Sequence, residues 1–550
     1  MRCLKVLIVV HFFRRFLRSI ELLSSEIPAL PHQGIPLMLS KVLSCATYGV
    51  NAYLVEAETH IEKQIPSFSI VGLPDNAVKE SRERITAAIK NCGFDFPIKK
   101  LTINLAPADV KKEGSSFDLP MAIGILTSTE QVVDDVLKDF VLLGELALDG
   151  TLRPIHGALP MALEVRKRGV KGMIVPRENG KEAAMVEGIE VYPMSTLKET
   201  VEFLNADHAS LSPLKVNIGE LFQHDQKYLA DFADVKGQEN VKRALEVAAS
   251  GGHNIIMIGP PGSGKTMLAK RLPSILPPLS FEEALETTKI HSVAGLLPPD
   301  TALVATRPFR SPHHTISDAA LVGGGTIPRP GEISLAHHGV LFLDELPEFA
   351  RNVLEVLRQP LEDGRVTISR SRLSVEYPAN FMLVCAMNPC PCGYYTDPGK
   401  DCTCLPQAIQ KYMAKISGPL LDRIDLHIEV PAVKYKELSS KESGECSDRI
   451  RTRVIAAREI QVHRFKGRKG LYANADMQSK DIREYCKLDA AGEELLKMAI
   501  TKLGLSARAY DRILKVGRTI ADMAGSTDIR PEHVSEAIQY RTLDRNLTGF

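Results

Sequence analysis

The chain has 550 residues, a formal net charge of +1, 44% hydrophobic residues and 25% charged residues, a composition typical of a folded protein, and its length predicts about three or four domains. A nearly neutral chain is not a polycation, so any surface that binds nucleic acid must be local. No apolar run approaches the roughly 20 residues of a membrane-spanning helix, and ten cysteines are too few for a disulfide scaffold in a chain of this length.

The first 37 residues differ from the rest of the chain. The apolar run Val6–Val10 is soon followed by His11 and the pair Arg14–Arg15, and no small-residue cleavage site comes after it. We expect residues 1–37 to be a disordered extension, or to precede a translation start at Met38. A signal peptide is the alternative. The run is too short to cross a bilayer, so no membrane partner is expected.

Residues 38–205 predict an α+β domain in which strands and helices alternate. Strands are expected at 52–57, 68–72 and 101–105, because these runs are rich in β-branched and apolar residues. Residues 77–91 carry apolar side chains at helical spacing and end shortly before a glycine, so they predict a helix.

Residues 112–119 and 144–150 of this domain resemble the fold shared by ribosomal protein S5 and the catalytic domain of Lon proteases. In Lon, a serine in the first stretch is the nucleophile and a lysine shortly after the second is its base. Ser116 falls near the nucleophile position, but residues 156–162 contain no lysine. A serine without a base is a weak nucleophile, and a lone histidine such as His156 is more often structural. We therefore expect a non-proteolytic relative.

A polar linker is expected at 206–230, and the phosphate-binding part of the chain follows it. An apolar strand at 253–258, a glycine-rich loop and a helix from 267 form the setting of a Walker A motif. The loop consists of Gly259, Pro260, Pro261, Gly262, Ser263, Gly264, Lys265 and Thr266. Its backbone N–H groups would surround phosphates, Lys265 would reach the β- and γ-phosphates, and Thr266 would ligate Mg²⁺. The motif predicts ATP and Mg²⁺ as cofactors.

Two further strands predict the remaining parts of a nucleotide site. Residues 340–345 form an apolar run that ends in Asp344 and Glu345, as in a Walker B strand. Asp344 would hold Mg²⁺, and Glu345 would act as general base toward an attacking water. The run 381–388 ends in Asn388, whose amide could orient that water.

Long stretches of the chain resemble the magnesium-chelatase-like AAA+ ATPases, and the match is closest to the ComM/YifB type, which joins an S5/Lon-like domain to this motor. The matching stretches are 307–315, 320–325, 328–337, 340–349 and 417–425. The resemblance implies that Asn388 is sensor 1, that Arg423 is the arginine finger for a neighbouring subunit's ATP, and that Arg508 is sensor 2, reaching over ATP from the lid. It also implies a ring, expected to be a hexamer.

The fold class expected from the motifs and the resemblance is α/β. The S5/Lon-like α+β domain would be followed by an AAA+ P-loop core with a helix-2 insert at 231–430, a basic connector at 431–475 and a C-terminal helical lid at 476–550. A physical reason also supports Arg423, because such ATP sites need a cation at the γ-phosphate as charge develops there. Its acidic neighbours leave surface ion pairs as the alternative role.

Four cysteines gather within residues 390–404, namely Cys390, Cys392, Cys402 and Cys404. Four thiols so close together suit a tetrahedral Zn²⁺ site, although the C-x-C spacing is tighter than usual. Free thiols or a redox-labile pair are the alternatives. Clustered thiols favour a reducing compartment, so we expect a cytoplasmic protein.

The run 364–375 predicts a hairpin, at the position where related helicases carry a pore hairpin. Arg370 and Arg372 near its tip could contact phosphates of DNA. Residues 449–469 hold eight Lys or Arg and one acidic residue, Glu459, and could add a basic patch. A solvated, charged surface is the alternative for both segments.

The motifs and the resemblance leave four candidate functions. The preferred one is a DNA-stimulated ATPase, a hexameric helicase or branch-migration motor acting on branched or single-stranded DNA in recombination or natural transformation. A magnesium-chelatase subunit is disfavoured by the extra domain at 38–205, and a Lon-type protease by its missing lysine. A regulatory AAA+ protein without a nucleic-acid role is the main alternative.

Overall fold

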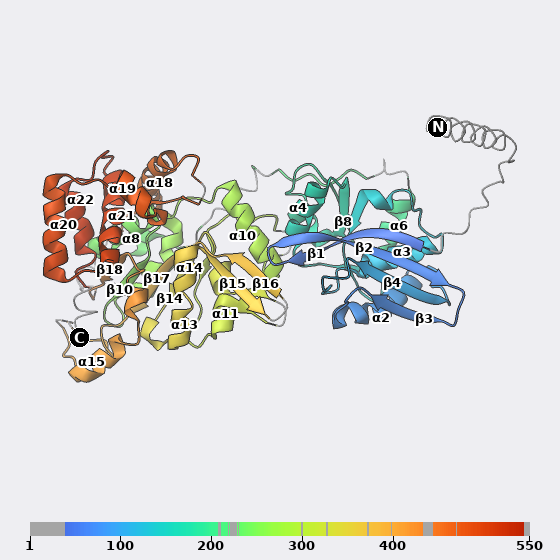
Figure 1. Ribbon diagram of the computed structural model, residues 1–550, viewed down its shortest axis with the longest axis horizontal. Coiled ribbons are helices and arrows are strands. Elements are labelled where there is room, and N and C mark those ends of the chain that lie inside the picture. Colours follow the sequence, from blue (N-terminus) through green and yellow to red (C-terminus); the bar gives the residue numbers. More distant parts are fainter. Residues whose placement is uncertain are drawn as a thin grey trace, which may run out of the picture.

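The computed structural model describes residues 39–206, 211–217, 219, 228, 230–298, 301–325, 328–370, 373–395, 397, 399–432, 444–468 and 470–543. The extension expected at 1–37 and most of the linker expected at 206–230 lie outside these residues. The described chain is elongated, with the N-terminal sheet at one end, the P-loop core in the middle and a group of helices at the other end (Figure 1).

The N-terminal part is built on a seven-stranded mixed sheet with the order β3-β4-β2-β1-β5-β8-β9. The strands are β1 (Leu39–Tyr48), β2 (Asn51–Glu62), β3 (Ser67–Val71), β4 (Lys100–Ala106), β5 (Phe140–Leu142), β8 (Gly172–Pro176) and β9 (Glu190–Met194), with β6 (Glu145–Leu146) and β7 (Leu152–Arg153) as a separate small pair. The helices are α2 (Asn76–Asn91), α3 (Asp118–Ser128), α4 (Ala158–Arg168), α5 (Gly180–Ala183) and α6 (Leu197–Asn205). The three strands and the helix expected from the sequence are all present.

The β1–β2 turn illustrates how local sequence sets this sheet. Tyr48 pairs with Asn51, so the turn has two residues, and Gly49 has a φ of 60°. Two-residue hairpins favour such left-handed backbone conformations, which glycine adopts without strain. The turn projects toward the central part of the molecule (Figure 1).

The central part is a five-stranded parallel sheet with the order β11-β14-β17-β10-β18. The strands are β10 (Ile255–Ile258), β11 (Phe309–Arg310), β14 (Val340–Leu343), β17 (Met382–Met387) and β18 (Leu426–Glu429). All residues of β10, β14 and β17 are buried, as expected for a parallel sheet covered on both faces. The register places Phe342 beside Val384, and Ile256 beside Cys385.

Short elements surround this sheet, and a helical group follows it. The helices around the sheet are α8 (Glu239–Gly251), α9 (Lys265–Arg271), α10 (Phe281–Ala294), α11 (Asp318–Val322), α12 (Glu332–Leu335), α13 (Arg351–Glu355), α14 (Arg358–Asp363), α15 (Pro406–Met413) and α16 (Gly418–Leu421). Two short strand pairs accompany them: β12 (Gly323–Gly324) pairs with β13 (Arg329–Pro330), and β15 (Arg365–Arg370) pairs with β16 (Leu373–Pro378). The helical group comprises α18 (Ser447–Arg464), α19 (Ser479–Tyr485), α20 (Ala490–Leu503), α21 (Ala507–Met523) and α22 (Pro531–Gln539). The expected hairpin is therefore present as β15–β16.

Many arginines of the basic segment 449–469 make contacts within the chain, which limits the surface that they offer to phosphates. Helix α18 buries Ile450 and Val454 in the same core as α8 and α21. Arg458 donates to the Ala249 carbonyl at 2.9 Å. Four other arginines form ion pairs: Arg451 with Asp448, Arg453 with Glu246 and Glu445, Arg464 with Asp522, and Arg468 with Asp481 and Glu484. Arginines that satisfy carboxylates and carbonyls here are not available as a row of phosphate contacts.

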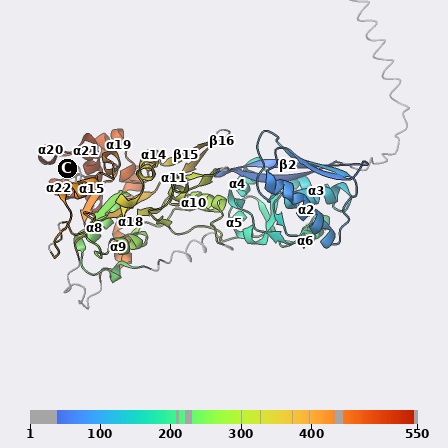
Figure 2. The ribbon, with the colours of Figure 1, turned by 90° about the horizontal axis from the view of Figure 1, so that it is seen from below.

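Two of the contacts that join the N-terminal sheet to the central part involve hydrogen bonds between side chains and distant segments. At the first, the Ser292 hydroxyl of α10 donates to Glu182 of α5, whose carboxylate also accepts from the Leu159 N–H at 2.9 Å and from the Asn179 amide at 3.2 Å. Glu182 is buried, and this burial raises the pKa of its carboxyl group. Figures 1 and 2 both show α10 beside α4 at this boundary.

At the second contact, the β1–β2 turn touches the β15–β16 hairpin. The Tyr48 hydroxyl donates to the Ser374 carbonyl at 3.1 Å. A Cβ atom on Gly49 would come within 2.4 Å of a Val375 methyl, so the turn can approach only because residue 49 is glycine. Val50 packs against the core beneath the hairpin.

We expect Glu182→Ala to destabilise the protein by about 2 kcal/mol, because buried donors on Leu159, Asn179 and Ser292 would lose their acceptor. Glu178→Ala, an exposed position in the same turn, is the control and should be neutral. The comparison is made by thermal unfolding of the two variants. Equal melting temperatures for both would show that the Glu182 contacts contribute nothing to stability.

Candidate active site

The Walker A residues form a loop between β10 and α9, at the carboxyl edge of the parallel sheet. Lys265, at the start of α9, turns its ammonium group back onto this loop. Nζ donates to the carbonyls of Gly259 (2.8 Å) and Pro260 (2.9 Å), and it lies 3.2 Å from Asn388 Oδ1. The side chain is buried, and burial lowers the pKa of its ammonium group. The ammonium thus sits inside the loop, where a phosphate oxygen could replace the carbonyls as its partner.

Three glycines give the loop its shape. Gly262 and Gly264 have φ values of 78° and 89°, in the left-handed region that favours glycine. At Gly259 a Cβ atom would come within 2.1 Å of the Val430 carbonyl oxygen of the neighbouring chain segment. The space beside Gly262 is open within 4 Å, so the loop can hold an anion close to its backbone.

Thr266 and Asp344 fit a Mg²⁺ site. Asp344 directly follows β14, and the Thr266 hydroxyl donates to its Oδ2 at 2.6 Å. One hydroxyl and one carboxylate side by side at the edge of a phosphate loop are the oxygen donors that Mg²⁺ takes together with phosphates. When bound, the ion would neutralise negative charge on the phosphates. These two residues would hold it.

Glu345 lies next to this pair and has an unusual backbone. Its φ is 52°, and its N–H donates to Asp344 Oδ1 at 3.0 Å. The side chain is 58% exposed, and Oε2 lies 3.4 Å from His314 Nδ1. A carboxylate that is turned outward beside the phosphate loop is available to accept a proton from water.

His314 receives no role from the sequence, although it belongs to the stretch 307–315 that matches the family. Its ring lies 4.1 Å from the ring of His313 and 6.4 Å from that of Phe349, centroid to centroid. These neighbours hold the ring beside Glu345, so that His314 can orient the carboxylate. A histidine pair upstream of a Walker B strand is too common to reveal this contact without the fold.

Asn388 completes the group at the carboxyl edge. It follows β17, the strand between β14 and β10, and its amide oxygen accepts from Lys265. The structure therefore brings together Lys265, Thr266, Asp344, Glu345 and Asn388, which lie up to 123 residues apart in the chain. Parallel strands whose carboxyl ends share one edge account for this convergence.

Arg423 and Arg508 lie at the opposite edge of the sheet. Asp425, just before β18, accepts from the Asn254 N–H at 2.9 Å, which marks the amino ends of β18 and β10. Arg423 pairs with Glu362 and also donates to the Pro419 carbonyl. Arg508 lies 3.7 Å from Asp422.

Arg508 lies away from the phosphate loop of its own chain, and its assignment as sensor 2 stays a prediction. Strands β10 and β18 each have four residues, which separates the two edges by about 13 Å. Arg423 and Arg508 instead line a cleft of about 820 Å³ at the amino edge, together with Arg512 and Lys515. The arginines face away from the phosphate loop of their own chain.

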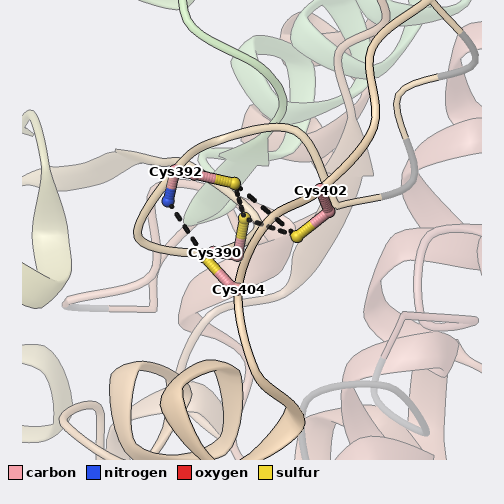
Figure 3. Close-up of side chains that lie close together, drawn as sticks. All are labelled: Cys390, Cys392, Cys402 and Cys404. Carbon is pink, nitrogen blue, oxygen red and sulfur yellow. Dashed lines mark hydrogen bonds between the residues drawn. The ribbon is translucent and has the colours of Figure 1, made fainter.

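The four clustered cysteines converge on one point (Figure 3). The sulfur of Cys390 lies 3.3 Å from that of Cys392 and 3.7 Å from that of Cys402, and the Cys392–Cys402 distance is 3.6 Å. Cys404 completes a group whose ligand atoms all lie within 4.8 Å of one another. A hydrogen bond from the Tyr394 backbone N–H lowers the pKa of the Cys392 thiol to about 6. The cluster suits a soft divalent metal such as Zn²⁺.

A second group, Glu286, His337 and His338, also brings potential ligands together. Here, however, His337 Nδ1 accepts from the Asn380 backbone N–H at 3.0 Å, so the neutral ring carries its proton on Nε2. That proton points at Glu286, 3.2 Å away. The ring nitrogen nearest to the carboxylate is a donor and not a metal ligand, so this group is a hydrogen-bonded cluster.

The remaining predicted residues lie away from these sites. In the N-terminal part, the Ser115 hydroxyl donates to Glu145, and the Ser116 carbonyl accepts from the Gly144 N–H at 3.0 Å. Among the described residues, no lysine or histidine is hydrogen-bonded to the Ser116 hydroxyl. Arg370 ends β15, but its side chain and all of Arg372 lie outside the described residues. No helix in the described part of the chain is long and apolar enough to cross a membrane.

Comparison with known proteins agrees with the division into an N-terminal part, a P-loop core and a C-terminal helical group. Three family models match: "Subunit ChlI of Mg-chelatase" over residues 57–179, "Magnesium chelatase, subunit ChlI" over 231–438, and "Magnesium chelatase, subunit ChlI C-terminal" over 444–541. "Competence protein ComM" of Haemophilus influenzae is 46% identical over 512 residues, which cover 92% of this chain and 98% of that protein. The chain belongs to the ComM/YifB magnesium-chelatase-like family.

Two further relatives define the extent of the ComM/YifB likeness. "Uncharacterized protein YifB" of Escherichia coli is 46% identical over 511 residues, with the same coverage of both chains. The "Magnesium-chelatase 38 kDa subunit" of Rhodobacter capsulatus is 29% identical over 177 residues, only 29% of this chain and 50% of that protein. The predicted fold class is confirmed: an S5/Lon-like domain, an AAA+ P-loop core and a helical C-terminal region. Membership in this AAA+ family indicates an ATPase.

We expect Lys265→Ala to weaken ATP binding by about 100-fold, because the loop loses its buried cation. Glu345→Gln should leave the affinity nearly unchanged and slow hydrolysis by about 100-fold or more, since only the proton acceptor is removed.

The exposed neighbours Lys270→Ala and Glu348→Gln are the matched controls and should behave as wild type. Affinity is measured with a fluorescent ATP analogue and hydrolysis by phosphate release. Wild-type turnover by Glu345→Gln would remove Glu345 from the role of base.

Proposed function

We propose that the protein is an ATP-hydrolysing AAA+ motor that assembles as a ring and acts on DNA. We propose a ring because two sets of functional residues lie at opposite edges of the same sheet. Lys265, Thr266, Asp344, Glu345 and Asn388 gather at the carboxyl edge of the sheet, while Arg423 and Arg508 line a cleft at the amino edge. One chain supplies a nucleotide pocket and, about 13 Å away, the cations that such a pocket needs.

A ring would bring the carboxyl edge of one subunit next to the amino edge of its neighbour. If the amino edge of one subunit faces the phosphate loop of the next, Arg423 meets the neighbour's γ-phosphate and Arg508 approaches it from the helical group. Arg423 is buried, and its Nε has no hydrogen-bond partner among the described residues. A buried donor without a partner is costly, and a neighbouring subunit could satisfy it. We propose a hexamer, as the AAA+ resemblance implies.

DNA is the proposed substrate for two reasons. A relative that matches this chain almost from end to end carries the name "Competence protein ComM", which supports a role in the uptake or integration of DNA. By the family resemblance, the β15–β16 hairpin corresponds to a pore hairpin; Arg370 ends β15, and Arg372 falls between the two strands in the sequence. In a ring these arginines would recur around one channel, where branched or single-stranded DNA could contact them.

Hydrolysis would follow from the groups at the carboxyl edge. Lys265 and the loop N–H groups would hold the phosphates of ATP. Glu345, oriented by His314, would take a proton from the attacking water, and Asn388 would hold that water in line. Thr266 and Asp344 would hold Mg²⁺. The four-cysteine cluster would hold a structural Zn²⁺, for which no open coordination position is needed.

A regulatory or chelatase-type AAA+ ATPase without DNA is the second candidate. The ion pairs made by the arginines of α18 favour it, since they remove part of the basic surface that DNA would need. The chelatase version is weakened because the 38 kDa subunit matches only 29% of the chain.

For the ring, we expect Arg423→Ala to bind ATP normally and to lose about 1,000-fold in hydrolysis. Mixed with Lys265→Ala protein, it should regain activity, because a subunit with an intact pocket then receives an intact arginine from its neighbour. Phosphate release is followed across mixing ratios, and mixed rings are verified by tag pull-down. No recovery in verified mixed rings would argue that Arg423 does not act between subunits.

For DNA, we expect forked DNA to stimulate the ATPase and to bind with a salt slope of about −0.7 to −0.9 per phosphate contact. Arg370→Ala with Arg372→Ala should reduce both the binding and the stimulation but leave the basal ATPase intact, since the nucleotide site lies elsewhere. Arg365→Ala, at the base of the same hairpin and 3.5 Å from Glu376, is the control. Anisotropy that shows no binding by the ATP-bound oligomer at low salt would favour the regulatory candidate.

A further inference from the structure

We infer that zinc in the four-cysteine loop, residues 390–404, sets the shape of the ATP site, so that loss of the metal disables nucleotide binding and hydrolysis. This inference rests on the proposed ATPase and on the proposed zinc site. It adds a control over that site by a metal that takes no part in the chemistry. Three features support it: the sulfur geometry, the backbone around the sulfurs, and the contacts that lead to Lys265.

The sulfur geometry matches a tetrahedral zinc site. With Zn–S bonds of about 2.3 Å, the sulfurs of a regular tetrahedron lie about 3.8 Å apart. The three distances among Cys390, Cys392 and Cys402 are 3.3, 3.6 and 3.7 Å. A disulfide would need about 2.05 Å, and all four cysteines are free thiols. The fold has therefore brought three sulfurs close to the spacing that a metal requires, with the sulfur of Cys404 within 4.8 Å of them, without forming bonds between them.

Backbone N–H groups point at the same sulfurs. Cys390 Sγ accepts from the N–H of Gly393 at 3.1 Å and from that of Tyr395 at 3.4 Å, and Cys404 Sγ accepts from the Cys392 N–H at 3.4 Å. Such donors stabilise negative charge on sulfur, the form in which cysteine binds metal. Cys390 is fully buried, and crowding thiolates there without a cation would be unfavourable.

The cysteine loop is in direct contact with the ATP site. Cys390 is two residues beyond Asn388, whose amide oxygen accepts from Lys265. Gly393 packs so tightly against the phosphate loop that a Cβ atom there would come within 2.5 Å of Pro261. Tyr412 of α15, just past the last cysteine, hydrogen-bonds the Asn388 backbone. The cysteine loop thus contacts the phosphate loop at Pro261, and it joins Asn388 to α15, whose Tyr412 bonds the Asn388 backbone.

The described residues of this loop are not held by secondary structure. They form turns and irregular structure between β17 and α15, without a helix or strand. Cross-linking its two ends through a metal restricts the chain in the way that a covalent link does. When the metal leaves, the support of Pro261 and Asn388 goes with it. A displacement of about 1 Å in a catalytic group can lower a rate by about 100-fold.

The test uses the full chain, purified without chelator. Zinc content is measured by plasma mass spectrometry, affinity for a fluorescent ATP analogue by titration, and ATPase by phosphate release. Zinc is then removed with a zinc-selective chelator, the chelator is removed, and excess Mg²⁺ is restored. We expect about one zinc per chain, a loss of about tenfold in nucleotide affinity and a loss of about 100-fold in ATPase on removal. Added Zn²⁺ should restore both, and Mg²⁺ alone should restore neither.

Cys402→Ser and Cys404→Ser should reproduce the metal-free state, whereas Cys446→Ser, outside the cluster, should not. Circular dichroism and thermal melting show whether each variant is folded. If a variant is unfolded, the reversible removal of zinc from the wild-type chain tests the inference instead. Zinc that can be removed without change in nucleotide affinity overturns the inference, and so does a chain that binds no zinc. A zinc-dependent affinity without any hydrolysis would instead refute the proposed ATPase while the inference stands.

Discussion

The hydrogen bond from Lys265 Nζ to Asn388 Oδ1 joins the two central strands of the P-loop sheet at their carboxyl ends. It can form only because β10 and β17 are parallel neighbours in register, Ile258 beside Met387, with each strand delivering a polar group just beyond its last buried residue. The rest of the site follows from the same constraint, since β14 pairs with β17 on the other side and brings Asp344 to the same edge. The parallel sheet thus determines where the side chains of the site lie, and the loops add the remaining contacts.

The same parallel arrangement is the basis of the ring that we propose. Arg423 precedes β18, so the direction of the strand commits it to the amino edge, and no local rearrangement carries it to the phosphate loop of its own chain. The cleft that it shares with Arg508, Arg512 and Lys515 is also lined by the acidic residues Glu286, Glu362 and Asp476. The proposed ring therefore follows from the direction of the strands.

Several elements could be predicted from the sequence because their signals are local. The Walker A glycines require left-handed backbone, the buried strands are continuous apolar runs, and the β15–β16 hairpin alternates about a polar tip. Other features depend on pairs distant in sequence. Ser292 meets Glu182 across 110 residues, and Arg453 meets Glu246 across 207. No periodicity reports such pairs, so the sequence alone suggests an exposed basic helix and gives no sign of the contacts that Arg508 makes with Asp422 and His314 makes with Glu345.

The contact of the β1–β2 turn with the β15–β16 hairpin has a mechanical consequence. The Tyr48 hydroxyl holds the Ser374 carbonyl, and Gly49 admits Val375 into the turn, so the hairpin is tethered to a seven-stranded sheet outside the P-loop core. If the protein is the motor that we propose, a stroke that moves the hairpin must either break this tether or carry the N-terminal sheet with it. The N-terminal sheet would then move with the hairpin as one mechanical unit.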